Sequence, residues 1–197
     1  MRILFAAPDR DLLECYKKLL ESDFGETVTA FDGTQVYSLM SAEKFDIVII
    51  DSGIPRVDCK KLLLQAQETC TPVILLTEKP VRAGTLTDET VSNEYLVYPF
   101  APAQVVQTVR GILEKAASGE RLHIDGMEIN VPEFRIAGGP RLTSKEIDVV
   151  RTLLSGGIVS ADDGPYVSAL NSRFASVGSN VRIKYGTKKG FELVTEK

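Results

Sequence analysis

The fold is decided by the stretch Phe45-Asp46-Ile47-Val48-Ile49-Ile50-Asp51-Ser52-Gly53-Ile54-Pro55. Its centre, residues 47–50, is a run of β-branched residues that places apolar side chains on both faces of a strand. Such a run is typical of a parallel strand that is buried on both sides. Asp51 follows directly, and Gly53 and Pro55 then end the strand. Because the ligand crevice of an open parallel sheet lies at the carboxyl ends of its strands, we expect chemistry at Asp51.

Four further stretches have the composition of strands, namely residues 1–7, 27–30, 72–77 and 94–100. The third of these ends in the hydroxyl of Thr77, and the fourth is interrupted by a proline near its end. At these strand ends the chain resembles the receiver domain of a two-component response regulator. The resemblance implies a doubly wound, five-stranded parallel sheet of the flavodoxin and CheY type. It places Asp51 at the phospho-acceptor position and Thr77, Tyr95 and Tyr98 at switch positions.

The chain departs from the receiver pattern where the family holds its magnesium ion and its phosphoryl group. Ala7 and Pro8 stand at the two acidic positions after the first strand, and Tyr98 stands at the position of the family's lysine. Mg²⁺ prefers oxygen ligands, and phosphoryl transfer depends on cations that neutralise the developing charge. We therefore expect inefficient phosphorylation of Asp51, and neither a metal nor another cofactor; Asp9 and Asp51 alone would form a poor Mg²⁺ site.

Helices are expected between these strands. Asp9 is a suitable N-cap for a helix whose apolar face holds Leu12, Tyr16, Leu19 and Leu20. Further helices are predicted near residues 33–40, 60–68 and 103–117, and a short, irregular one at 78–93, where threonines and valine are poor helix formers. In the family, the last strand and the last helix form the usual dimer surface, which implies a homodimer through this domain.

The chain divides into two domains of opposite charge. Ala116-Ala117-Ser118-Gly119-Glu120 is small and polar, as interdomain linkers are, and we predict a first domain at 1–117, a linker at 118–121 and a second domain at 122–197. Residues 1–120 carry a net charge of −6 and residues 121–197 one of +2. This asymmetry suits a regulatory domain joined to a nucleic-acid binder.

The second domain begins with alternating apolar residues around Asp-Gly and Gly-Gly turns, which predicts a small antiparallel sheet over residues 121–139. Thr143, followed by Glu146 three residues later, forms a capping box before an apolar helix. This order resembles the winged-helix effector domain of OmpR/PhoB-type regulators, an α+β fold. The resemblance implies a recognition helix at 166–174 and a wing at 181–193. Residues 158–164 are too few for a further family helix, so we expect a domain that is truncated relative to the family.

The candidate DNA contacts follow from this resemblance. They are Tyr166, Ser168, Ala169, Asn171, Ser172, Arg173, Arg182, Lys184, Lys188 and Lys189. Asn171 is expected to read an adenine edge, while the arginines and lysines are expected to contact phosphates. The recognition helix is poor in arginine for this family, so each charge could equally be a solvated surface group.

Composition limits the class of protein. The 44% hydrophobic and 25% charged content is that of an ordinary globular protein, and the chain has no apolar run of about 20 residues. The three cysteines lack C-x-x-C spacing, and the single histidine, His123, argues against a zinc site or a catalytic triad. We therefore predict a cytoplasmic protein that is not an enzyme and has no membrane partner.

Three functions remain open at the level of sequence. The leading interpretation is a DNA-binding transcriptional regulator that acts on double-stranded DNA without phosphorylation. The alternative is an adaptor that binds a protein partner through the receiver-like domain and a winged helix that no longer reads DNA. The third is a phosphotransfer-competent regulator in which Asp9 is the lone metal carboxylate.

Overall fold

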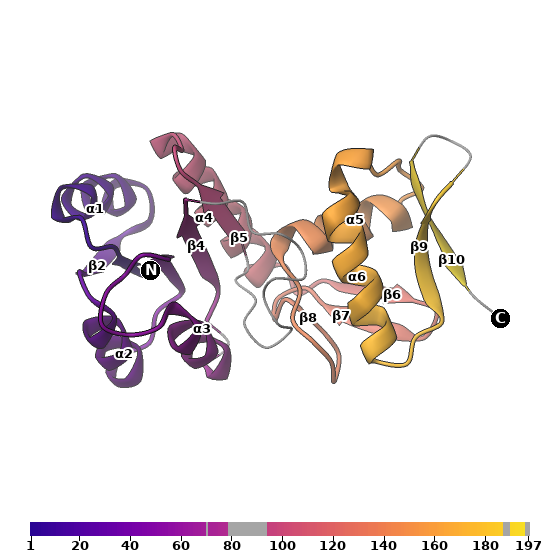
Figure 1. Cartoon of the computed structure of the whole chain (residues 1–197), viewed down its shortest axis with the longest axis horizontal. Helices are drawn as coiled ribbons and strands as arrows, with labels where there is room; N and C mark the ends of the chain where they lie inside the picture. The colour runs from indigo at the N-terminus through magenta and orange to yellow at the C-terminus, as the bar shows by residue number, and fades with distance from the viewer. Residues whose placement is uncertain (70, 79–93, 187–189, 196–197) are drawn as a thin grey trace. The chain divides into compact units, whose positions relative to one another are not determined.

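A computed structural model describes residues 1–69, 71–78, 94–186 and 190–195 (Figure 1). These residues form two compact units, an N-terminal one that ends at Glu114 and a C-terminal one that begins at Lys115. The exact place of the interdomain linker stays a prediction. Among the described residues, no helix has the length and apolar character needed to cross a membrane.

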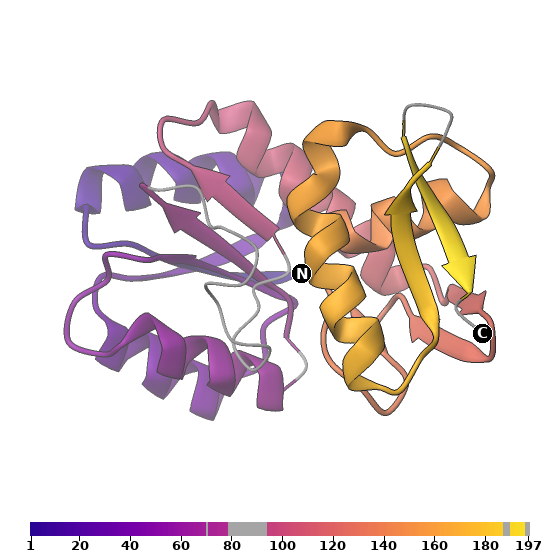
Figure 2. The ribbon, with the colours of Figure 1, turned by 45° about the vertical axis from the view of Figure 1, so that its right-hand side comes forward.

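The N-terminal unit is built on a five-stranded parallel sheet with the strand order β2-β1-β3-β4-β5. The central strand β3 is fully buried from Ile47 to Ile50, which confirms its position between two covering layers. Helices α1 and α4 cover one face of the sheet, and α2 and α3 cover the other (Figure 2). The doubly wound α/β fold is therefore confirmed. The strands are β1 (Arg2–Ala6), β2 (Glu26–Ala30), β3 (Ile47–Asp51), β4 (Val73–Thr77) and β5 (Glu94–Val97).

Helix boundaries in this unit follow from local capping. The Asp9 carboxylate accepts hydrogen bonds from the backbone N–H groups of Asp11 and Leu12, and Gly25, with φ +111°, ends the helix. The Asp32 side chain caps the second helix in the same way. The helices are α1 (Arg10–Phe24), α2 (Gly33–Ala42), α3 (Cys59–Glu68) and α4 (Pro102–Ala117). The predicted irregular helix at 78–93 lies, apart from its first residue, outside the described residues.

The apolar face of α1 differs from the predicted one. Leu13, Tyr16 and Leu20 are its buried residues, whereas Leu12 and Leu19 are only half-buried. Apolar residues stand next to one another in the α1 sequence, so helical periodicity is compatible with either of two adjacent apolar faces. Packing against the sheet buries the face that contains Leu13.

The C-terminal unit begins with the predicted antiparallel sheet. Asp125 and Gly126 both have positive φ values, +45° and +80°, as the tight turn of a β-hairpin requires. Phe134, Leu170 and Phe174 are fully buried in this unit. Its elements are β6 (Arg121–Ile124), β7 (Met127–Asn130), β8 (Arg135–Ile136), α5 (Ser144–Leu154), the 3₁₀ helix η1 (Ala161–Asp163), α6 (Gly164–Ser176), β9 (Val181–Tyr185) and β10 (Phe191–Thr195).

Two details of this unit match the sequence prediction closely. The capping box is formed: the Thr143 hydroxyl accepts from the Glu146 N–H at 3.1 Å, and the Glu146 carboxylate accepts from the Thr143 N–H at 2.7 Å. Between α5 and α6 the chain forms only the three-residue η1 helix, so the segment is as short as predicted.

Candidate functional site

Asp51 lies at the carboxyl end of β3, in the middle of the parallel sheet. One of its oxygens, Oδ1, accepts a hydrogen bond from the Gly53 N–H at 2.7 Å. The other, Oδ2, accepts a hydrogen bond from the Tyr98 hydroxyl, also at 2.7 Å. Both carboxylate oxygens of the predicted acceptor position are therefore engaged by groups of the protein itself.

A hollow of about 630 Å³ opens at this edge of the sheet. It is lined by Asp9, Asp51, Thr77 and Tyr98, together with Leu12 and neighbouring loop residues. The structure thus brings together three of the predicted receiver positions, Asp51, Thr77 and Tyr98, with Asp9 beside them. Tyr95, the other predicted switch residue, packs instead against the apolar core cluster from β5.

Tyr98 is held in place by other aromatic rings. Its ring lies 4.5 Å from that of Phe100, which meets Tyr16 edge-on at 6.1 Å; Tyr16 in turn stacks on Phe5 at 5.5 Å. Burial and the hydrogen bond to Asp51 raise the pKa of Tyr98, so its phenol stays protonated and remains a donor.

The residues at this edge do not fit the Mg²⁺ site that the receiver fold implies. Ala7 and Pro8 offer no side-chain oxygen, and an Asp9 oxygen already accepts two backbone N–H groups as the cap of α1. Among the described residues, no three His, Cys, Asp or Glu side chains are grouped to hold a metal. Mg²⁺ keeps several of its waters and needs only one or two carboxylates from the protein, but the acidic pair that the receiver pattern provides for it is replaced here by Ala7 and Pro8.

Helix α6 carries most of the predicted DNA contacts, and two of them are corrected by the structure. Arg173 is only 5% exposed, and its Nε donates to Glu146 Oε1 at 3.1 Å. Asn171 bonds the backbone of Ile183 twice: its Nδ2 donates to the carbonyl at 2.8 Å, and its Oδ1 accepts from the N–H at 2.7 Å. Arg173 cannot reach a phosphate from there, and Asn171 has no amide edge left for adenine. Both residues fix the packing of α6.

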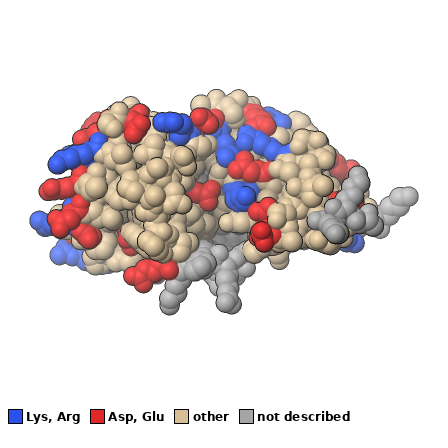
Figure 3. Space-filling model, turned by 90° about the horizontal axis from the view of Figure 1, so that it is seen from above, with Lys and Arg blue, Asp and Glu red and all other residues tan. Residues whose placement is uncertain are grey.

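The remaining predicted contacts differ in exposure. On α6, Ser168 and Ser172 are exposed, whereas Tyr166 and Ala169 are half-buried. On β9, Lys184 is exposed, while the Arg182 guanidinium donates to the carbonyls of Ser179 and Val181. Lys188 and Lys189 lie outside the described residues. On the face shown in Figure 3, basic and acidic side chains are interspersed.

Sequence reasoning missed two partnerships. Tyr98 was identified as the replacement for a lysine, but its hydrogen bond to Asp51 was not foreseen, although a hydroxyl at a lysine position can still donate to the same carboxylate. Arg173 precedes the buried Phe174, and the side chain of Glu146 already turns back toward the N-cap Thr143 as part of the capping box of α5. Those two facts together indicate a buried ion pair between α5 and α6.

Comparison with known proteins finds relatives among transcriptional regulators. No protein-family model matches the chain. Probable transcriptional regulator ycf27 of Cyanophora paradoxa is 27% identical over 147 residues, which cover 66% of this chain and 60% of that protein. Transcriptional regulatory protein CpxR of Escherichia coli is 30% identical over 124 residues, which cover 61% and 52%. The homologues of this chain are transcriptional regulators.

Solved structures show the same fold. The receiver domain of DrrB, activated with BeF3, has a TM-score of 0.51 and 25% identity, covering 57% of this chain and 97% of that one. The complete response regulator DrrB, described as a Thermotoga maritima OmpR/PhoB homolog, has a TM-score of 0.53 at 19% identity and covers 98% of both chains. The first match covers the receiver fold, and the second extends the likeness of fold over the whole chain. This chain spans only 52–60% of the length of the first two curated relatives. A shared activity is therefore a proposal for this chain.

Proposed function

We propose that this protein is a transcriptional regulator of the response-regulator type that binds double-stranded DNA and works without phosphorylation of Asp51. Independence from phosphorylation is supported by one observation: Asp51 accepts two hydrogen bonds, one from Gly53 and one from Tyr98. Both oxygens are engaged, and Ala7 and Pro8 stand where the receiver pattern has the two carboxylates that hold Mg²⁺. Charge that develops during phosphoryl transfer would therefore be poorly neutralised.

The DNA-binding part of the proposal rests on the C-terminal unit and on the names of the relatives. Helix α6 and the β9–β10 hairpin are neighbours in this unit, as a recognition helix and a wing would be. Exposed Ser168 and Ser172 on α6 are suited to hydrogen bonds with phosphates or base edges, and exposed Lys184 on β9 is suited to a phosphate. We further propose a homodimer through the N-terminal unit and no enzymatic activity.

The adaptor remains the second candidate because one specific observation favours it. The α6 residues best suited to contact DNA are Asn171 and Arg173. The side chains of both form hydrogen bonds within the C-terminal unit instead. A helix that depends on serines alone for base contacts discriminates weakly between sequences. In this case the partner would be a protein, and DNA binding would be salt-sensitive and without sequence preference.

The test combines phosphorylation with DNA binding on the same preparation. The full chain is incubated with acetyl phosphate and Mg²⁺, analysed by intact mass, and then titrated with duplex DNA. We expect no phosphoryl adduct and the same DNA affinity with and without the phosphodonor. A stoichiometric adduct that an Asp51→Asn variant does not form would overturn phosphorylation independence, and DNA affinity that rises with the adduct would establish a conventional switch.

A further inference from the structure

The segment that joins α4 to β6 is a hydrogen-bonded turn, although its composition is that of a flexible linker. The Ser118 N–H and hydroxyl both donate to the carbonyl of Lys115, at 3.2 and 2.8 Å. The Glu120 N–H donates to the Ser118 hydroxyl at 3.2 Å, and Gly119 adopts a φ of +64° that favours glycine. Residues 115–120 therefore have a defined conformation, and we call them the strap.

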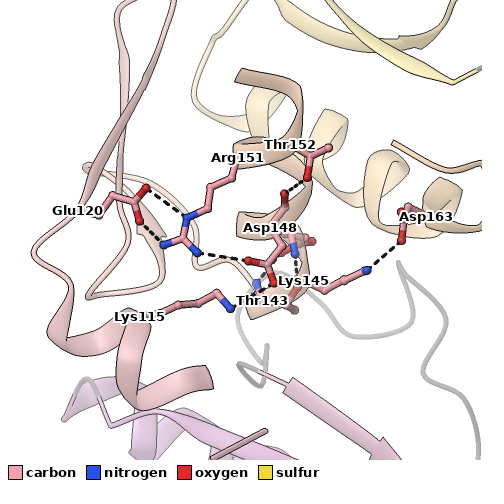
Figure 4. Close-up of polar contacts among 9 residues, drawn as sticks. Lys115, Glu120, Thr143, Lys145, Asp148, Arg151, Thr152 and Asp163 are labelled. Atoms are coloured by element: carbon pink, nitrogen blue, oxygen red, sulfur yellow. Dashed lines mark hydrogen bonds and ion pairs between the residues drawn. The ribbon is translucent and has the colours of Figure 1, made fainter. Parts of the chain in front are cut away.

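The charged ends of the strap pair with helix α5 (Figure 4). The Glu120 carboxylate binds Arg151 through two parallel contacts, with Nε at 3.2 Å from Oε1 and Nη2 paired with Oε2. Lys115 Nζ lies 3.2 Å from Asp148 Oδ2, and its side chain is only 12% exposed. Arg151 also reaches Asp148 at 3.4 Å, so the four charges form one connected network.

The same glutamate is fixed through its backbone. The Val131 N–H, just after β7, donates to the Glu120 carbonyl at 3.2 Å. Glu120 is thus attached to α5 by its side chain and to the sheet of the C-terminal unit by its main chain. Planar two-point contact between arginine and carboxylate gives this attachment a defined geometry.

We propose that the strap is a salt-sensitive attachment, in which Arg151 and Asp148 hold residues 115–120 against α5 and so fix where the chain enters the C-terminal unit. Single exposed ion pairs contribute little, but a connected network with a two-point arginine contact contributes more. Because salt screens charges at the surface, the strap detaches as ionic strength rises, before the unit as a whole unfolds. This attachment belongs to the fold of the C-terminal unit and does not depend on DNA binding.

Hydrogen exchange of the full chain tests this attachment directly. The amides of Ser118, Glu120 and Val131 report the strap, and exchange is measured at about 0.1 M and about 1 M NaCl, where the Debye length falls from ~10 to ~3 Å. In Arg151→Met we expect these amides to exchange about fivefold faster at low salt, since roughly that factor corresponds to one lost surface pair. High salt should raise the wild-type rates toward those of the variant.

Lys145→Met is the matched control, because Lys145 lies on the same helix and pairs with Asp163 at 3.3 Å, outside the strap. It should leave the strap amides unchanged. The charge exchange Glu120→Arg with Arg151→Glu should restore part of the slow exchange if charge pairing is the cause, but not all of it, because the new carboxylate at position 151 faces Asp148. Thermal unfolding checks that each variant is folded. Equal exchange in Arg151→Met and Lys145→Met, or no recovery in the charge exchange, would overturn the proposal.

Discussion

Removal of the Tyr98 hydroxyl tests how much the hydrogen bond from Tyr98 to Asp51 contributes to stability. Tyr98→Phe keeps the ring and its contact with Phe100 and deletes only the donor to Asp51. A hydrogen bond to a charged group contributes about 1.5–3 kcal/mol. Because Tyr98 is half-buried, we reduce this to about 1–1.5 kcal/mol for the free energy of unfolding. For a domain of this size, that is a fall in Tm of roughly 4–10 °C.

The assay is urea unfolding as a function of pH, with Tyr37→Phe as the control because Tyr37 is exposed and makes no contact with Asp51. The raised pKa of Tyr98 means that the folded protein holds this proton more tightly than the unfolded chain. Its contribution is complete below pH ~10, the ordinary pKa of tyrosine, and is lost as pH rises through the folded value. Tyr98→Phe should therefore be less stable at pH 7 and lose less stability than the wild type above pH 10. Equal stability of Tyr98→Phe and Tyr37→Phe at pH 7 would refute the reasoning.

Three further predictions concern buried or half-buried groups. Arg173→Ala should lower the free energy of unfolding by about 3–5 kcal/mol, because it leaves the Glu146 carboxylate buried without its cationic partner. Adding Glu146→Gln should recover part of this loss. A decrease of less than ~1 kcal/mol in urea unfolding would contradict the prediction. Burial raises the pKa of Cys59 to about 12, so a thiol reagent at pH 8 should modify exposed Cys15 before Cys59, as mapped by mass spectrometry; comparable rates at these two sites would contradict it. Gly33→Ala should lower the free energy of unfolding by about 1–3 kcal/mol, because a Cβ at this position would lie 2.7 Å from a side-chain carbon in the loop after β3. Unchanged thermal stability of this variant would contradict the prediction.

The fold was predictable because its local signals agree with one another. The β-branched run before Asp51, the Asp9 cap and the capping box of Thr143 and Glu146 each specify one element, and all three occur as expected. The choice between two adjacent apolar faces on α1 was not predictable in this way, because packing against the sheet decides it.

The site was predictable in position but not in its bonding. The order of strands brings Asp51, Thr77 and Tyr98 to one edge, whereas the bond between Asp51 and Tyr98 joins residues 47 positions apart and depends on side-chain conformation. Arg173 was misread because a charged residue on a candidate recognition helix suggests DNA contact, and only the tertiary structure places it against Glu146. The conformation of the strap was not predictable from the sequence, because a small and polar composition does not reveal the hydrogen bonds of residues 115–120.

The central claim is tested most directly by selection of random-sequence duplex DNA with the purified, unphosphorylated full chain at about physiological salt, where non-specific contacts weaken. We predict an enriched motif, with two half-sites about 10 base pairs apart if the protein binds as a dimer. Lys184→Ala should weaken binding to all sequences alike, as the loss of a phosphate contact does. No enriched motif, with only weak and salt-sensitive binding, would contradict the account and direct the search to a protein partner.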